Sequence, residues 1–204
     1  MQINTSRIIL TPIGPHEEKP TGGMFLFLRH VCTVLPRAYI GLGSNLGDRA
    51  SLLDSAIEAM ASRWNTPPIV SRRYRAPAWG MPSGTPDFLN QVVAFQNLEL
   101  SDPEDLIRDV LEIEQQLGRE RPSSAVGYVS RTVDIDLLAM DGMEWNSSKL
   151  ILPHPRMHMR KFVLLPLADI APELRPTPGG PTVDRLLKDC PDVSSVHLWE
   201  PTLD

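Results

Sequence analysis

The sequence has few cysteines, no long apolar run and no excess of positive charge, and each absence argues against a class of protein. Its 204 residues include only 2 cysteines, Cys32 and Cys190, without the spacing of a zinc site or a redox motif. No disulfide framework is implied, and two free thiols indicate a reducing compartment. The formal net charge of −5 gives no broad field for attracting nucleic acid.

The apolar stretches are too short to predict a membrane-spanning helix. The one near the N-terminus, residues 24–35, is interrupted by Arg29 and His30 and follows the acidic pair Glu17 and Glu18. A secretory signal would begin with basic residues and continue with an unbroken apolar stretch. We therefore expect a cytoplasmic protein with neither a membrane partner nor a nucleic-acid partner.

The chain divides into an N-terminal extension, residues 1–36, and one domain with a C-terminal tail, residues 37–204. The extension has no clear hydrophobic period and is rich in proline and glycine, so we expect it to lie outside the core domain. Three possibilities stay open for it: partial disorder, an alternative start at Met24, or an added edge strand at residues 25–28. The domain is long enough to bury a substantial core.

From residue 38 onward the hydrophobic periods become regular. Strands are expected at 38–43, 69–74, 88–97 and 131–138, and helices at 48–60, 101–117, 157–168 and 183–190. Asp48 is the expected N-cap of the first helix, and Ser101 and Glu104 form a capping-box pattern at the start of the second. The first four strands and first two helices follow the order of a split βαβ arrangement. We therefore predict an α+β, ferredoxin-like sandwich, with a mainly antiparallel sheet and helices on one face.

The strongest chemical signal is a pair of acids, Asp134 and Asp136, inside an apolar run. On a strand these two acids share one face, while Val133, Ile135 and Leu137 take the other. Repulsion between carboxylates about 6 to 7 Å apart costs roughly 2 to 3 kcal/mol at an effective dielectric of about 20. A divalent cation removes that cost, and hard oxygen ligands suit Mg²⁺. The simpler alternative is an exposed strand face with two solvated acids.

Positive charge gathers just before the acids, at Arg119, Arg121 and Arg131 around a loop of small residues. Guanidinium groups bind phosphate oxygens through paired hydrogen bonds, so these arginines could offset a triphosphate. Solvated arginines in a surface loop are the alternative.

The glycine-rich stretch at residues 41–47 lacks the lysine of a phosphate-binding P-loop. Its glycines more simply permit a tight turn and a close backbone approach to a ligand.

Two further segments could recognise a flat heterocycle or a nucleotide. The loop beginning at Ala76, Pro77 and Trp79 leads to Phe88, which could stack on a ring, and to Asn90, which could donate and accept at its edge. Phe88 in the core and Trp79 as a loop plug are the alternative.

The second segment carries His154, Arg160 and Phe162, and could hold a nucleotide or cover the other face of the ring. A lone histidine is more often structural or solvated, so His154 is a candidate only through its context.

Together these motifs resemble those of the 6-hydroxymethyl-7,8-dihydropterin pyrophosphokinases of folate biosynthesis. The resemblance runs over residues 38–174 and includes AYIGLGSNLG at 38–47, PDFLN at 86–90, GRER at 118–121, RTVDID at 131–136, PHPR at 153–156 and FVLLPLADIAP at 162–172. It implies a ferredoxin-like fold that uses two Mg²⁺ ions and ATP as co-substrate. The implied reaction transfers pyrophosphate from ATP to the pterin hydroxymethyl group and releases AMP.

By position, the resemblance implies three groups of site residues. The catalytic group joins the metal ligands to the phosphate clamps: Asp134, Asp136, Arg119 and Arg131. The pterin group holds two ring faces, an edge reader and a loop: Phe88, Phe162, Asn90, Ala76, Pro77 and Trp79. The ATP group is Glu114, Arg119, Arg121, Tyr128, Arg131, Ile135, His154 and Arg160.

Two other functions compete with this interpretation. A nonenzymatic paralogue would bind pterin or nucleotide while the loop at residues 127–130 no longer closed. A nucleotidyltransferase would release pyrophosphate instead of AMP, but its glycine-serine and acidic motifs normally lie closer together than here. We expect a monomer that acts on small molecules.

Overall fold

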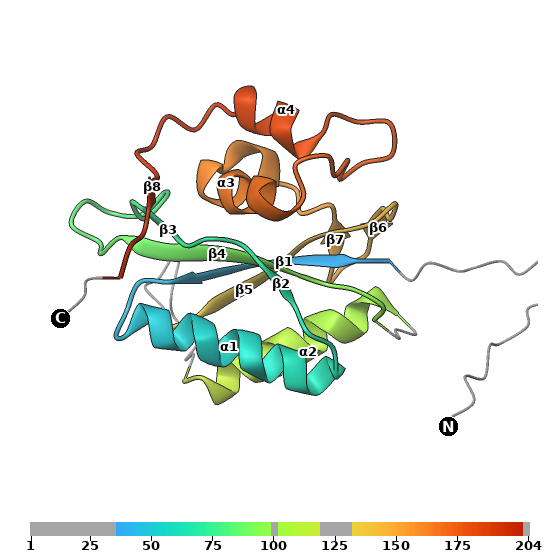
Figure 1. Ribbon diagram of the computed structural model, residues 1–204, viewed down its shortest axis with the longest axis horizontal. Coiled ribbons are helices and arrows are strands. Elements are labelled where there is room, and N and C mark those ends of the chain that lie inside the picture. The colour runs from blue at the N-terminus through green and yellow to red at the C-terminus, as the bar shows by residue number, and fades with distance from the viewer. Residues whose placement is uncertain (1–35, 99–101, 119–131, 202–204) are drawn as a thin grey trace, which may run out of the picture. The chain divides into compact units, whose positions relative to one another are not determined.

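The computed structural model describes residues 36–98, 102–118 and 132–201 (Figure 1). The elements, in chain order, are β1 (Ala38–Ser44), α1 (Arg49–Trp64), β2 (Ile69–Val70), β3 (Tyr74–Ala76), β4 (Phe88–Phe95), α2 (Pro103–Gln116), β5 (Asp134–Met140), β6 (Trp145–Asn146), β7 (Ile151–Leu152), the 3₁₀ turn η1 (Met157–Met159), α3 (Lys161–Ile170), α4 (Val183–Lys188) and β8 (His197–Leu198). Expectations for residues 1–35 and for the loop at 119–131 lie outside the described residues.

The main sheet has the strand order β5-β1-β4-β3-β8, with β2 also pairing with β4. Every pairing between named strands is antiparallel. Because β1 lies between β5 and β4, and β4 lies between β1 and β3, each helix crossover skips one strand, as in a split βαβ unit. The predicted α+β, ferredoxin-like fold is therefore confirmed.

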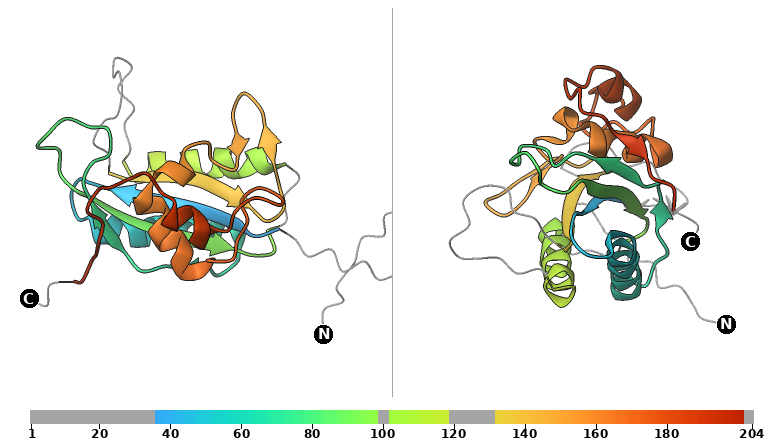
Figure 2. Two further views of the ribbon diagram at one scale, coloured as in Figure 1. Left: turned by 90° about the horizontal axis from the view of Figure 1, so that it is seen from above. Right: turned by 90° about the vertical axis from the view of Figure 1, so that its left-hand side faces the viewer.

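Helices cover both faces of the sheet, whereas the sequence prediction placed them on one. In Figures 1 and 2, α1 and α2 lie under the sheet as expected, and α3 and α4 lie over the opposite face. The second face is apolar in its own right: Val92, Ala94 and Leu138 pack there against Leu164 and Leu167 of α3. A face this apolar needs cover, and α3 and α4 supply it.

Local signals in the sequence explain how α1 and α2 begin and end. The Asp48 carboxylate accepts a hydrogen bond of 3.1 Å from the Ser51 backbone N–H, which caps α1. At the other end Asn65 takes the left-handed conformation that commonly closes a helix. Asp102 caps α2 by accepting from the Glu104 N–H at 2.8 Å. Ser101, where the expected capping box began, lies outside the described residues.

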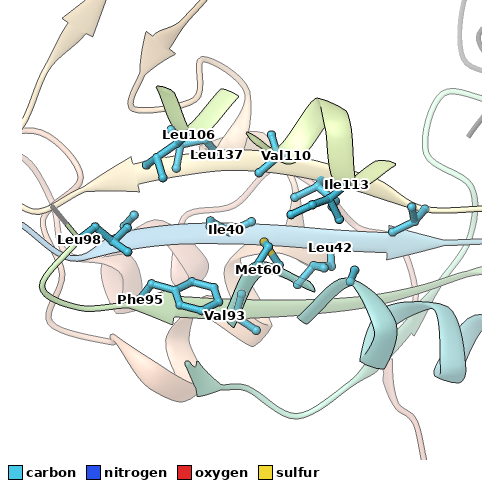
Figure 3. Close-up of a cluster of buried hydrophobic side chains, with 14 of the residues drawn as sticks. Ile40, Leu42, Met60, Val93, Phe95, Leu98, Leu106, Val110, Ile113 and Leu137 are labelled. Atoms are coloured by element: carbon cyan, nitrogen blue, oxygen red, sulfur yellow. The ribbon is translucent and has the colours of Figure 1, made fainter. Parts of the chain in front are cut away.

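The larger core lies between the sheet and the first two helices (Figure 3). Ile40, Val93 and Leu137 point into it from β1, β4 and β5, where they meet Val110 and Ile113 of α2. On β5 this uses every second residue, so Asp134, Asp136 and Leu138 face the other side, toward α3. The predicted division of this strand into an apolar face and an acidic face is confirmed.

Three elements differ from the prediction in extent. The short strand expected at residues 69–74 is two strands, β2 and β3. Ser71 separates them, because its side-chain oxygen accepts from the Val92 N–H at 2.9 Å. The helix expected at 157–168 is interrupted at Arg160, which has an extended backbone between η1 and α3. The edge strand β8 was not predicted.

Candidate active site

Two neighbouring pockets meet at Asp134 and Asp136, which line both. The first, here the aromatic pocket, lies on the α3 side of the sheet and contains three aromatic side chains. Its lining is Gly41, Leu42, Gly43, Pro77, Trp79, Met81, Phe88, Asn90, Gln91, Val92, Asp134, Asp136, Leu138, Arg160, Phe162 and Val163. The second pocket is bounded by α2, β5 and the segment around β7 and His154.

A row of residues crosses four strands of the sheet, and its members on β4, β1 and β5 line the floor of the aromatic pocket. Tyr74 of β3 lies opposite Asn90 of β4, Asn90 opposite Gly43 of β1, and Gly43 opposite Asp134 of β5. Directly opposite residues share a face of an antiparallel sheet, so the Asn90 amide and the Asp134 carboxylate stand on either side of a glycine. The middle of this floor is therefore bare backbone.

Gly43 leaves little room for a side chain, because its neighbours lie close to the position that a Cβ atom would take. A Cβ atom there would lie 3.3 Å from Asn90 Oδ1 and 3.4 Å from a ring carbon of Phe88. Gly41 is similar, since its Cβ would lie 3.3 Å from the Leu138 side chain. Both glycines belong to β1, so close backbone approach explains them, whereas Gly47, with a φ of +64°, makes the turn that follows.

The aromatic walls come from three separate segments. Phe88 stands at the start of β4, Trp79 in the loop after β3, and Phe162 in the first turn of α3. The Arg160 guanidinium links two of them, because its Cζ lies 5.3 Å from the Trp79 ring centroid and 5.8 Å from that of Phe162. Such cation–π contacts hold the rings in place around the pocket.

Arg160 also connects the aromatic walls to the acid pair. Its Nη1 lies 3.6 Å from Asp136 Oδ2, and its side chain is only 7% exposed while that of Asp136 is 41% exposed. A buried guanidinium needs such a partner, because unpaired charge away from water is costly. Arg160 thus restrains one side of the Asp136 carboxylate, which stays partly exposed where the two pockets meet.

In the second pocket, a buried acid holds the strand that carries the acid pair. Glu114 of α2 is 1% exposed, and its Oε1 accepts a 2.8 Å hydrogen bond from the backbone N–H of Ile135. Ile135 lies between Asp134 and Asp136, so this bond anchors β5 where the two carboxylates emerge. The other residues of this pocket are Ile107, Val110, Leu111, Leu137, Lys149, Leu150, Ile151, His154 and Pro155.

His154 lies in the second pocket as a neutral side chain. Its backbone N–H donates to the Leu138 carbonyl at 2.7 Å, and its Nδ1 accepts from the Arg156 N–H at 3.2 Å. Burial, followed by the positive charges of Arg160 and Arg156, lowers the pKa of His154 to about 4. At neutral pH the imidazole therefore offers no positive charge, and it can act only through hydrogen bonds and contact.

The lowered pKa of His154 predicts a specific loss of stability in acid. The unfolded chain takes up a proton on this histidine near pH 6.5, but the folded chain does so only near pH 4, so unfolding is favoured as pH falls between these values. From pH 7 to pH 5 the wild-type free energy of unfolding should fall about 2 kcal/mol further than that of His154→Asn. Urea unfolding of both proteins at both pH values measures this.

Asparagine is the suitable replacement because its Oδ1 can still accept the hydrogen bond from Arg156. Other acids titrate in both proteins and cancel in the difference. Equal losses of stability in the two proteins would show that His154 is protonated as easily in the folded chain as in the unfolded one.

Comparisons with known proteins agree on one family. A family model described as 7,8-dihydro-6-hydroxymethylpterin-pyrophosphokinase (HPPK) matches residues 39–172. A relative from Methylorubrum extorquens, named 2-amino-4-hydroxy-6-hydroxymethyldihydropteridine pyrophosphokinase, is 43% identical over 157 residues, which cover 75% of this chain and 92% of the relative. One of the same name from Porphyromonas gingivalis is 42% identical over 146 residues, covering 71% and 97%. The chain belongs to the HPPK family.

Solved structures support the HPPK fold. A Plasmodium falciparum HPPK-DHPS structure with STZ-DHP aligns with a TM-score of 0.55 at 13% identity. The alignment covers 76% of this chain but only 43% of that one, so the chain spans less than half of the fusion protein. At this identity the likeness concerns the fold alone. Every residue that lines the two pockets falls within the span matched by the HPPK family model.

Most of the predicted HPPK site residues that the structure describes line one of the two pockets. Pro77, Trp79, Phe88, Asn90, Phe162 and Arg160 line the aromatic pocket, and Glu114, Ile135 and His154 line the second. Ala76 is buried and lines neither; it ends β3 just before the pocket loop. Arg119, Arg121, Tyr128 and Arg131 lie outside the described residues.

The structure adds pocket residues that the sequence did not single out. Met81 joins the aromatic wall, and Leu111, Lys149 and Ile151 border the second pocket. Leu111 and Ile151 are 42% and 47% exposed, which is unusual for large aliphatic side chains. Leu111 follows the buried Val110 and lies off the apolar stripe of α2, and Ile151 lies on the two-residue strand β7, which has no period to read.

The acid pair fits magnesium better than a fully protein-bound metal. Among the described residues no group of three histidine, cysteine or acidic side chains could hold a metal ion. Asp134 and Asp136 offer only carboxylate oxygens, half-exposed and open to both pockets. Mg²⁺ suits so sparse a set of hard donors because it retains waters and binds substrate phosphates.

None of the helices in the described ranges is long and apolar enough to span a bilayer.

Proposed function

We propose that this chain transfers a pyrophosphoryl group from ATP to the hydroxymethyl oxygen of 6-hydroxymethyl-7,8-dihydropterin and releases AMP. The chain belongs to the pyrophosphokinase family of folate biosynthesis. The alignments cover nearly the whole length of relatives that are named for this activity. The observation that carries the mechanism is that Asp134 and Asp136 line both pockets. Two substrates in adjoining pockets would bring their reacting groups together at these carboxylates.

The aromatic pocket is the proposed pterin site. Phe88 and Phe162 would stack on the two faces of the bicyclic ring, and flat apolar walls favour a flat heterocycle. Asn90 would read the ring edge, because its buried amide can both donate and accept. Its own hydrogen bonds, to the Tyr74 and Phe88 carbonyls, are long at 3.4 and 3.5 Å. A ligand could therefore compete for this amide at little cost.

The second pocket is the proposed ATP site. The aliphatic side chains of Leu111 and Ile151 offer apolar contact to the nucleotide base. His154, neutral at pH 7, would contact the nucleotide by hydrogen bonding. The family resemblance assigns four residues that precede β5 in the chain to ATP as well: Arg119, Arg121, Tyr128 and Arg131. Arg119 and Arg131 are the proposed phosphate clamps.

Transfer of a phosphoryl group depends on position and charge neutralisation more than on a protein nucleophile. Asp134 and Asp136 would hold two Mg²⁺ ions, which supply charge neutralisation at the phosphates when bound. Glu114 keeps the intervening backbone fixed, and Arg160 restrains Asp136, so both carboxylates are preorganised. The aromatic walls orient the pterin hydroxyl toward them.

We also propose that the enzyme acts as a monomer in the cytoplasm. The described residues of a single chain already form both pockets, which supports a site built within one subunit. The free thiol of Cys190 suits a reducing compartment.

Product analysis tests the reaction. With ATP, Mg²⁺ and hydroxymethyldihydropterin together, the enzyme should form AMP and pterin pyrophosphate in equal amounts, and leaving out the pterin or the Mg²⁺ should stop AMP formation. AMP formed without pterin would indicate simple hydrolysis. Release of pyrophosphate would indicate a nucleotidyltransferase, and tight pterin binding without any turnover would indicate a binding protein.

A further inference from the structure

Helix α3 begins without a cap from its own N-terminal residue. Arg160 occupies the N-cap position, with φ −123° and ψ 100°, and its side chain makes no capping hydrogen bond. That position normally carries Ser, Thr, Asp or Asn, whose side chains accept from the first free N–H groups of the helix. Arginine has no acceptor, and here its guanidinium lies between Trp79 and Phe162 in the aromatic pocket.

Asp192 supplies the missing cap from a distant part of the chain. Its Oδ2 accepts a 3.0 Å hydrogen bond from the backbone N–H of Lys161, 31 residues earlier, and its Oδ1 accepts from Ser194 at 2.9 Å. Burial favours the neutral acid, but the hydrogen bonds from Ser194 and Lys161 outweigh it and hold the pKa of Asp192 below its ordinary value. A carboxylate charged at neutral pH is favourable at a helix N-terminus.

The segment that carries Asp192 is fixed at its far end as well. It runs from α4 past α3 to β8 at the sheet edge (Figure 1). There His197 and Leu198 pair with Arg75 and Tyr74 of β3, and the Trp199 N–H donates to the Arg73 carbonyl at 2.9 Å. The segment thus joins the first turn of α3 to the strand that leads into the Pro77 wall. It lies beyond residue 172, where the HPPK family match ends.

We propose that Asp192 is a positioning residue for the pterin site, which acts by fixing the first turn of α3. This inference rests on the proposed function of the aromatic pocket. The capped N–H belongs to Lys161, and its two neighbours in the chain are Arg160 and Phe162, both of which line that pocket. Without the cap, the first turn of α3 loosens, and the wall residues Arg160 and Phe162 lose their fixed orientation.

The test compares Asp192→Ala with Asp192→Asn. Loss of a helix N-cap shifts the equilibrium between the ordered and the loosened first turn roughly fivefold toward the loosened state. Asparagine caps about as well as aspartate, so it should leave this equilibrium nearly unchanged. By calorimetry with Mg²⁺ and a nonhydrolysable ATP analogue, Asp192→Ala should raise the Kd of hydroxymethyldihydropterin about fivefold, while Asp192→Asn stays within about twofold of wild type. Hydrogen exchange at the Lys161 amide should accelerate in Asp192→Ala alone.

Asp189→Ala is the matched control. It removes an acid from the same C-terminal region, but Asp189 is exposed and pairs with Arg185, away from the pocket. Its pterin affinity should equal that of wild type. If Asp192→Ala does not fold, Asp192→Glu takes its place, because the longer side chain keeps the charge but displaces the acceptor, and pterin affinity should again fall.

The possible failures are distinguishable. If wild type binds pterin and Asp192→Ala binds it equally well, the positioning role is wrong while the proposed function stands. If asparagine weakens binding as much as alanine does, the charge and not the cap is responsible, and the inference is again wrong. If wild type binds no pterin, the proposed function falls and the inference falls with it.

Discussion

Asp136→Asn should lower kcat by about a thousandfold while the protein stays folded, because the change removes about 4 kcal/mol of charge stabilisation from the reacting phosphates. Asparagine keeps the size of the side chain and one oxygen, but it lacks the negative charge with which Asp136 would hold Mg²⁺ in the proposed mechanism. Asp136 is partly exposed, and the asparagine oxygen can still accept a hydrogen bond from the buried Arg160 guanidinium, so the fold should survive the loss of charge. Steady-state AMP formation at saturating Mg²⁺ measures the loss.

Two comparisons make this result specific. Asp134→Asn should also be severe, since Asp134 shares the face and both pockets. Asp184→Asn, which alters an exposed acid paired with Lys188 on α4, should leave kcat unchanged. Turnover near the wild-type rate in Asp136→Asn would refute the metal assignment. A urea midpoint of Asp136→Asn far below that of wild type would indicate a structural role instead.

Phe162→Ala should weaken pterin binding by about thirtyfold to a hundredfold, because one apolar face of the ring site is lost, worth about 2 to 3 kcal/mol. The Arg160 guanidinium would also lose one of the two rings that it contacts. Phe162 does not line the second pocket, so the affinity for an ATP analogue should stay close to wild type. Calorimetry with each ligand separates the two effects.

Phe162→Tyr is the matched variant for this prediction, because it keeps the ring and should bind pterin within a few-fold of wild type. An equal loss in the tyrosine and alanine variants would mean that shape at this position, and not the flat face, decides affinity. Equal weakening of pterin and ATP analogue would mean that the substitution disturbs both pockets through the fold.

The sequence predicted well those features that depend on short-range periodicity. Side chains on a strand point to alternate faces, so Asp134 and Asp136 lie on one face of β5 and Ile135 on the other, whatever the rest of the fold does. The cap at Asp48 acts on the N–H of Ser51, three residues away, and could be predicted for the same reason. The family resemblance then supplied roles that the periodicity does not contain.

Features that depend on contacts between distant residues were missed. The second helical layer was missed although β4 runs through Val92, Val93, Ala94 and Phe95 without a polar residue, a pattern typical of strands covered on both faces. The strand β8 has two residues and no period to read. Arg160 was expected among the ATP contacts, and its place between Trp79 and Phe162 follows from a side-chain path that sequence spacing does not reveal.

In the proposed pterin site, the row from Asn90 through Gly43 to Asp134 sets the distance between the residue that would read the ring edge and the acid pair. Asn90 and Asp134 are separated by two inter-strand spacings, about 9 to 10 Å, and backbone hydrogen bonds hold that length constant. A ring recognised at one end therefore reaches the acids only if its reactive arm has the matching length. The strand pairing would thus select the proposed substrate by size, and a slip of one residue in β4 or in β5 would turn the end group of that strand away from the pocket.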